Sequence, residues 1–183
     1  MHDPKQTADR FDAILESYYK AWFRYHPEAA VEAGHDAYAG CLTPYGDDDA
    51  GALASLNREL MFSLEELDAE MLDVDRQVDF ELAWSSAALE SEELREADWR
   101  YRDPVRYLPV NAIYQLLIRP VGNFEEALQS RLEQIPEYLR GARRQLAARA
   151  DEIPSLWMLS ALQTAREGSR FLCSVPQHPH VQQ

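Results

Sequence analysis

Apolar residues recur at steps of three and four along most of the chain, and this spacing constrains the fold more than any other feature. Near the N-terminus it joins Phe11, Ile14, Leu15, Tyr18 and Trp22 into one stripe. Such a stripe is typical of an amphipathic helix that buries one face. No segment alternates apolar and polar residues with the β-branched content typical of a strand. The sequence therefore predicts an all-α fold.

Prolines, glycines and capping residues divide the chain into about seven or eight predicted helices. Thr7 is expected to cap the first, and Pro27 to open a short second helix that ends at Gly34. Pro136 and Pro154 are expected to begin the last two, because proline suits the first turn of a helix and disfavours its interior. Short connections favour antiparallel neighbours, so we expect a single helical bundle. The other predicted helices cover residues 50–72, 75–100, 108–118 (closed by Pro120) and 123–135.

Two of these predicted helices carry apolar lines that should be buried. The helix at 75–100 has two lines and is expected to be central, with neighbours on two sides. The last helix has one line at helical spacing. The lines consist of Val78, Leu82, Leu89 and Trp99, then Phe80, Trp84, Ala87 and Ala88, and in the last helix Leu156, Leu159, Leu162 and Ala165.

The chain length bounds the domain organisation. A chain of 183 residues suits one domain and can bury a sizeable core. We expect one helical domain over residues 1–172. Residues 173–183, CSVPQHPHVQQ, lack periodicity and are expected to form a flexible tail.

The net charge of −14 makes a nucleic-acid partner unfavourable, because phosphates would be repelled. The charge is also uneven along the chain. Residues 1–94 hold 6 Lys+Arg against 22 Asp+Glu, whereas residues 95–183 hold 12 against 10. Two interpretations stay open: the halves lie against each other with arginines facing acids, or the first half presents an acidic docking face.

Targeting features are not found in the sequence. No apolar run approaches the roughly 20 residues that cross a bilayer. The start of the chain, MHDPKQTADRFDAIL, has acids where a signal peptide has a basic start and an apolar stretch. We therefore predict a cytoplasmic protein without a membrane partner, with Cys41 and Cys173 as free thiols.

Residues 24–38, RYHPEAAVEAGHDAY, place two histidines, two glutamates and an aspartate within fifteen positions. Glu32 and His35 have the E-x-x-H spacing that di-iron bundles use twice. Here the spacing occurs once, and Gly34 is expected to end the helix between the two ligands. His26 precedes a proline helix start, where packing or capping is expected. The stretch therefore predicts a helix end and a polar loop rather than a metal site.

Other catalytic motifs are also missing from the sequence. There is no H-E-x-x-H, which a helical zinc peptidase needs, and no G-x-S-x-G or glycine-rich phosphate loop. His178 and His180 are expected to bind metal only adventitiously, and His2 has no histidine one turn away. Cys41 is close to His35 in sequence alone. We predict no catalytic residue, no metal and no cofactor in this chain.

Aromatic residues gather at the end of the first predicted helix: Tyr18, Tyr19, Trp22, Phe23 and Tyr25. Such a stripe either belongs to the core or lines a groove for a peptide or an apolar small molecule. With the adjoining polar loop, it gives the candidate binding residues for a ligand or partner. These candidates are Tyr18, Trp22, Tyr25, His26, His35 and Asp36.

Four segments resemble, in order, a bacterial family catalogued as a domain of unknown function, number 885. The family typically begins with an aromatic helix, a His-Pro-Glu-x-Ala turn and a Gly-x-His-Asp loop, matched here by residues 26–30 and 34–36. The resemblance covers roughly residues 9–172. The matching segments are YYKAWFRYHPEAAVEAGHDAYAGCL, DVDRQVDFELAWSSAALESEEL, RDPVRYLP and RLEQIPEYLRGARRQL.

The resemblance implies a peptidase ancestry. Full-length members are similar to helical zinc peptidases and carry H-E-x-x-H in a later part that has no counterpart here, so no catalytic residue carries over. We expect a truncated product or a stand-alone module that acts by binding itself, a peptide or a partner protein. The alternative is part of a zinc-dependent hydrolase whose metal-binding half is on another polypeptide. Loss of the later part would expose an apolar patch, so we expect a homo-oligomer, most simply a two-fold dimer.

Overall fold

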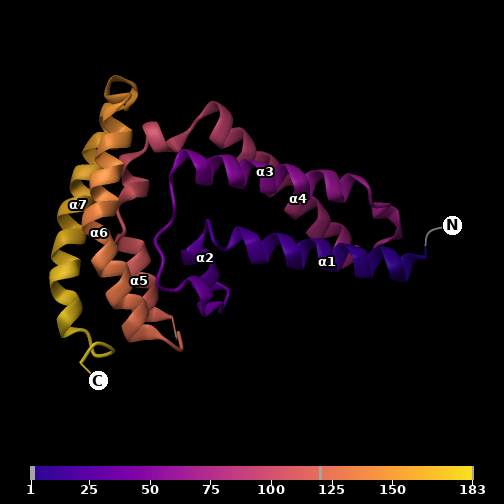
Figure 1. Cartoon of the computed structure of the whole chain (residues 1–183), viewed down its shortest axis with the longest axis horizontal. Helices are drawn as coiled ribbons and strands as arrows, with labels where there is room; N and C mark the ends of the chain where they lie inside the picture. Colours follow the sequence, from indigo (N-terminus) through magenta and orange to yellow (C-terminus); the bar gives the residue numbers. More distant parts are fainter. Residues whose placement is uncertain (1–2, 120, 183) are drawn as a thin grey trace. The chain divides into compact units, whose positions relative to one another are not determined.

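Seven α-helices joined by short 3-10 turns make up the computed structural model, which describes residues 3–119 and 121–182 (Figure 1). Within those residues no strand forms, so the predicted all-α fold of seven or eight helices is confirmed. Two residues named above, His2 and Pro120, lie outside the described residues. The helices are α1 (Pro4–Trp22), α2 (Pro27–Glu32), α3 (Asp47–Glu65), α4 (Val74–Glu96), α5 (Val110–Ile118), α6 (Phe124–Ala147) and α7 (Ser155–Ser174).

The 3-10 turns lie between and after these helices. They are η1 (Asp36–Tyr38), η2 (Ala69–Met71), η3 (Trp99–Tyr101), η4 (Pro104–Tyr107), η5 (Ala150–Glu152) and η6 (Val175–Gln177). The described residues group into two compact units. The first unit runs to Tyr25 and resumes over Pro44–Ala97; the second comprises His26–Thr43 and the described residues from Asp98 onward.

The first unit is built from α1, α3 and α4, which lie side by side (Figure 1). Phe11 and Tyr18 of α1 are buried together with Leu60 and Leu64 of α3 and Ala87 of α4. The apolar stripe predicted for the first helix therefore faces its core. Burial of this stripe stabilises a helix that would be marginal in isolation.

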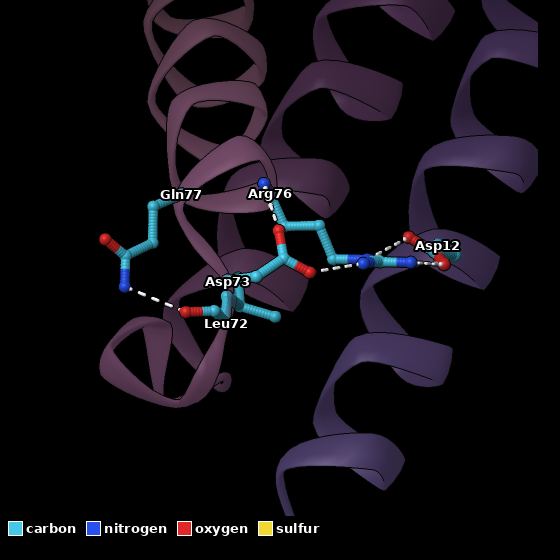
Figure 2. Close-up of polar contacts among 5 residues, drawn as sticks. All are labelled: Asp12, Leu72, Asp73, Arg76 and Gln77. Carbon is cyan, nitrogen blue, oxygen red and sulfur yellow. Dashed lines mark hydrogen bonds and ion pairs between the residues drawn. The ribbon is translucent and has the colours of Figure 1, made fainter.

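Arg76, in the first turn of α4, joins α1 to α4 through its guanidinium group (Figure 2). It donates to the Asp12 carboxylate from Nε at 2.9 Å and from Nη2 at 2.7 Å. Asp73 caps α4 by accepting from the backbone N–H of Arg76 at 2.9 Å, and it also pairs with the guanidinium. Side-chain hydrogen bonds from Arg76 lower the pKa of Asp12, and its backbone N–H lowers the pKa of Asp73. Gln77 donates to the carbonyl of Leu72 at 2.9 Å and closes the preceding turn.

The second unit packs α2, α5, α6 and α7 around its own core (Figure 1). Val31 of α2, Ile113 and Leu116 of α5, Leu128 of α6 and Val175 are all buried there. The short α2 ends as the sequence predicts, because Gly34 adopts a positive φ of 81° that L-residues rarely accept. The turn η4 contacts both α6 and α7.

Two predicted helix boundaries are wrong. Asp3 rather than Thr7 caps α1, accepting from the backbone N–H of Lys5 at 3.1 Å, and Thr7 is buried in the second turn. The predicted break at Pro136 does not occur, since α6 continues through it. The proline is exposed, and the apolar face of α6 continues on both sides of it. Packing of that face outweighs the hydrogen bond that proline removes.

The predicted burial is wrong for the first apolar line on α4 and for the line on α7, whereas Phe80 and Ala87 of the second α4 line do face the core. On α4 the buried residues are Ala83 and Ala87, whereas Leu82 and Leu89 are 60% and 68% exposed. On α7, Leu156 is 71% exposed. A helical period shows that apolar residues share a face, but a neighbouring element must be present to cover that face. The exposed members of the predicted lines are Val78, Leu82, Trp84, Leu89, Leu156, Leu159 and Leu162.

The chain end is helical for longer than its composition suggested. α7 continues to Ser174, and the turn η6 follows it, with Val175 buried in the second unit. The organisation expected from the sequence, one domain over residues 1–172 and a flexible tail at 173–183, stays a prediction.

Candidate functional site

The predicted binding residues at the end of α1 take part in a polar network inside the first unit. The Tyr18 hydroxyl donates to Oδ1 of Asn57 at 2.8 Å, and Nδ2 of Asn57 donates to Oε2 of Glu90 at 2.7 Å. Nε1 of Trp22 donates to the same Glu90 oxygen at 3.1 Å. Burial raises the pKa of Tyr18. These contacts tie α1, α3 and α4 together, so Tyr18 and Trp22 have a clear packing role.

The remaining predicted binding residues do not form one cluster with them. Tyr25, the last residue of its segment in the first unit, has the Arg24 guanidinium over its ring at 5.8 Å. His35 is exposed, and Asp36 accepts from the backbone N–H of Gly122 at 2.7 Å. His26 caps α2 without a side-chain cap hydrogen bond. The structure thus places the six predicted residues in two separate units.

His26 does line a polar pocket of about 290 Å³ in the second unit. Across it, Oε2 of Glu28 accepts from the Thr43 hydroxyl at 2.7 Å. At its rim, the Arg106 guanidinium lies over the Trp99 ring at 5.5 Å and 3.7 Å from the Asp103 carboxylate. These contacts hold the pocket wall together. They also engage the groups that would otherwise recognise a charged ligand.

A buried arginine lies close to this pocket. Arg131 of α6 is fully buried, and its guanidinium donates to the carbonyl of Ala112, which lines the pocket. Its Nε and Nη2 atoms have no hydrogen-bond partner among the described residues. Desolvation lowers the pKa of Arg131, while the charges of Glu28 and Cys41 act in the opposite direction. A buried cation of this kind stabilises little by itself.

The second hollow in this unit is an apolar groove of about 400 Å³ between α6 and α7, with η4 at its base. Ala142 of α6 and Ala161 of α7 are buried at its floor, whereas Leu139, Met158 and Leu162 remain between 37% and 49% exposed along its walls. Small residues at the floor leave space for side chains from another molecule. The lining residues include Tyr107, Leu108, Leu139, Ala142, Arg143, Leu146, Met158, Ala161, Leu162 and Ala165.

The first turns of α7 carry further exposed apolar residues. Leu156, Trp157 and Leu159, which do not line the groove, are also exposed there. Of the described residues that line the groove, Arg143 alone is charged. Arg140 and Arg144 both bind the Glu137 carboxylate, at 2.9 and 3.2 Å, whereas Arg143 has no ion-pair partner within residues 3–119 and 121–182. The groove is therefore apolar inside and positively charged at one edge.

Across the described part of the chain, no three His, Cys, Asp or Glu side chains come close enough to hold a metal ion. Over the same residues, no helix combines the length and the apolar character needed to cross a bilayer.

The fold and the hollows define an all-α protein with an open apolar groove. Comparisons of the chain with protein families, with curated proteins and with solved structures find no match. The resemblance to the family of unknown function number 885 stays a prediction that depends on the four sequence motifs.

The groove cannot be predicted from the sequence, because its walls come from separate helices. Leu159 and Leu162 belong to the apolar line predicted for the last helix, and Leu139 and Leu146 recur at helical spacing after Pro136. Periodicity placed these leucines on one face of each helix, but it could not show that the two faces border a gap. Arg131 did carry a signal, since it interrupts the apolar face formed by Leu128, Leu132 and Ile135.

Proposed function

We propose that this protein is a non-catalytic helical binding module whose α6–α7 groove takes the apolar face of a helix from a protein or peptide partner. The observation that carries this proposal is the groove itself, with Leu139 exposed on the α6 wall and Met158 and Leu162 exposed on the α7 wall. Exposed apolar surface of this extent on a folded chain marks interaction sites. An amphipathic helix in an apolar groove is a recurring mode of recognition.

The pocket that His26 lines is a less suitable binding site than the groove. Its Glu28 and Arg106 side chains already contact Thr43, Trp99 and Asp103 within the same unit. Occupation of that pocket would have to replace contacts that the fold already makes. Occupation of the groove would instead remove apolar surface from water, which is favourable at about 25 cal/mol per Å².

The positive charge at the groove edge predicts the charge of the partner. Arg143 favours a partner helix with carboxylates beside its apolar face. The test uses two synthetic amphipathic peptides of equal length and leucine content, one with glutamate and one with lysine at the polar positions. Isothermal titration of the full chain should show binding of the acidic peptide at least tenfold tighter than that of the basic peptide.

Matched variants localise that binding. Leu162→Glu, on the groove wall, should abolish it, whereas Ile118→Glu on α5 should preserve it, since both side chains are 49% exposed and outside the core. Circular dichroism would establish that both variants keep their helical content. Failure of both peptides to bind a monomeric chain, or equal binding by the two variants, would reject the proposal.

The alternative proposal, part of a zinc-dependent hydrolase completed by another polypeptide, depends on the family resemblance alone. It predicts that peptidase activity develops when a related chain carrying H-E-x-x-H is added, and that a chelator removes the activity. The binding-module proposal predicts no cleavage by this chain with or without zinc. Sustained chelator-sensitive cleavage by the lone chain would contradict the binding-module proposal.

A further inference from the structure

The outward face of α4 is an apolar surface that no other described element of the first unit covers. Val78, Leu82 and Leu89 lie on this face and are between 54% and 68% exposed. Steps of four and seven residues place them along one line of a helix. We call these three residues the α4 stripe. Because they belong to the first unit, the α4 stripe is distinct from the groove described above.

Acidic residues accompany the α4 stripe. Asp75, Asp79 and Glu92 are exposed on the same side of the helix. The two arginines of α4 are already engaged, Arg76 by Asp12 and Arg95 by Glu96 at 3.0 Å. The α4 stripe is therefore an apolar line with carboxylates beside it, which is the chemistry that the groove favours.

The groove and its surroundings carry the opposite charge. Arg143 lines the groove without an ion-pair partner in the described part of the chain. Arg166 and Arg170 lie on the exposed side of α7. Complementary potentials of this kind set the choice of partner and accelerate encounter. They also match the uneven charge of the sequence, acidic in residues 1–94 and slightly basic afterwards.

The dimensions of the two surfaces also agree. Leu82 and Leu89 are seven residues apart, which is about 10 Å along a helix. Met158 and Ala165, at the two ends of the groove wall on α7, are also seven residues apart. Two side chains of the α4 stripe therefore match the length of the groove.

We propose that the α6–α7 groove binds the α4 stripe of a second copy of this chain, through apolar contact flanked by carboxylates and Arg143. The inference rests on the proposed function and names the partner of the same groove. Each copy carries one stripe and one groove, so a two-fold pair would form the contact twice. Two contacts per dimer increase the buried area toward the roughly 1,000 Å² that a specific interface needs.

Sedimentation velocity of the full chain at tens of micromolar tests this inference. The unmodified chain should sediment as a dimer. Leu82→Glu on the stripe and Leu162→Glu in the groove should each weaken the dimer at least tenfold, whereas Phe62→Glu, at an exposed site on α3, should not. A mixture of the Leu82→Glu and Leu162→Glu chains should form heterodimers, because one stripe and one groove remain intact in each pair.

Charge reversal gives a second, independent readout. Asp79→Lys or Arg143→Glu alone should weaken the dimer, and an equimolar mixture of the two chains should restore it, because opposite charges face each other in both contacts of the mixed pair. Higher salt should reduce this restoration. Failure of the mixture to recover dimers would overturn the assignment of the charged edges.

The outcomes separate this inference from the proposed function. A monomeric chain that binds the acidic peptide would overturn the second-copy inference and leave the helix-binding groove intact. A dimer that Leu162→Glu disrupts and Leu82→Glu does not disrupt would likewise overturn the assignment of the α4 stripe as the partner and leave the helix-binding groove intact. A chain that neither dimerises nor binds either peptide would overturn both.

Discussion

The two units of this protein hold their helices together by different means. In the first unit, side-chain hydrogen bonds connect α1, α3 and α4, through Tyr18, Asn57 and Glu90 and through Arg76 with Asp12. In the second unit, close apolar packing around α5, α6 and α7 has the larger role. Both units bury an apolar core, but in the first unit directional polar contacts between the helices add to it.

The difference extends to the surfaces that the two units leave uncovered. The first presents leucines among carboxylates on α4, and the second presents an apolar groove with arginine at its edge. Polar networks specify one arrangement of helices, because each missing partner leaves a buried group unsatisfied. Apolar packing depends instead on volume. Substitutions in each unit can therefore distinguish these two kinds of stabilisation.

The largest effect is expected from Asn57→Ala in the first unit. Asn57 is fully buried and is the only residue of the described chain shown to bond both the Tyr18 hydroxyl and Glu90. Its removal leaves a hydroxyl and a carboxylate without that partner, which should lower the free energy of unfolding by about 3 kcal/mol. Urea unfolding followed by circular dichroism measures the loss.

A double-mutant cycle with Tyr18→Phe tests whether the contacts act as a network. Tyr18→Phe alone should cost about 1 kcal/mol, and much less once Asn57 is alanine, since its partner is already gone. Strictly additive losses would show that the two side chains act independently. The first unit would then depend on ordinary packing, as the second does.

The sequence predicted much of the fold because helix formation is largely local. The apolar period located α1 and α3, and proline and glycine signals located α2 at Pro27 and its end at Gly34. These signals act within a few residues of the chain. The break predicted at Pro136 failed because the choice there depends on packing of a long amphipathic face.

The surfaces could not be predicted from the period alone. Leu82 and Leu162 each belong to regular apolar lines, yet both lines are largely exposed, because no neighbouring helix covers them. The groove depends on where α6 and α7 lie relative to η4, a tertiary property. The sequence indicated Tyr18, Trp22 and His26 as candidate binding residues. It did not show that Tyr18 and Trp22 belong to a hydrogen-bond network in the first unit, whereas His26 lines a pocket in the second.

The second prediction concerns fit in the second unit. Gly168 of α7 is buried against α5, and a Cβ atom there would lie 2.3 Å from Cγ2 of Val110. Gly168→Ala should therefore displace the two helices and destabilise the protein by about 1–3 kcal/mol. Thermal unfolding measures this change.

Gly51→Ala in α3 is the matched control in the first unit. A Cβ atom there would meet no atom within 4 Å, so the substitution should instead stabilise the helix by up to about 1 kcal/mol. Opposite signs for the two variants would confirm that close packing limits the second unit. Equal effects would mean that Val110 moves aside freely and that fit is less important than the comparison implies.

The smallest effect is the pH dependence of the contact that joins α1 to α4. Arg76 lowers the pKa of Asp12 and of Asp73 below their unfolded values. A carboxyl with a lowered folded pKa contributes stability that is fully present above its unfolded pKa, near 4, and is lost as the pH falls through the folded pKa. Arg76→Gln should therefore lower the urea concentration at the unfolding midpoint at pH 7, and it should lower this concentration less at pH 2.5.

Arg95→Gln is the control for this titration, because Arg95 pairs with Glu96 at 3.0 Å on an exposed part of the same helix. An exposed pair of this kind contributes little to the free energy of unfolding. The urea midpoint of the Arg95→Gln variant should therefore match that of the unmodified chain at both pH values. Contacts made by the Arg76 guanidinium connect two helices, whereas those of Arg95 stay within one. An equal shift for Arg76→Gln at pH 7 and pH 2.5 would show that its ion pairs do not stabilise the first unit, and that the buried network around Asn57 supplies its polar stabilisation alone.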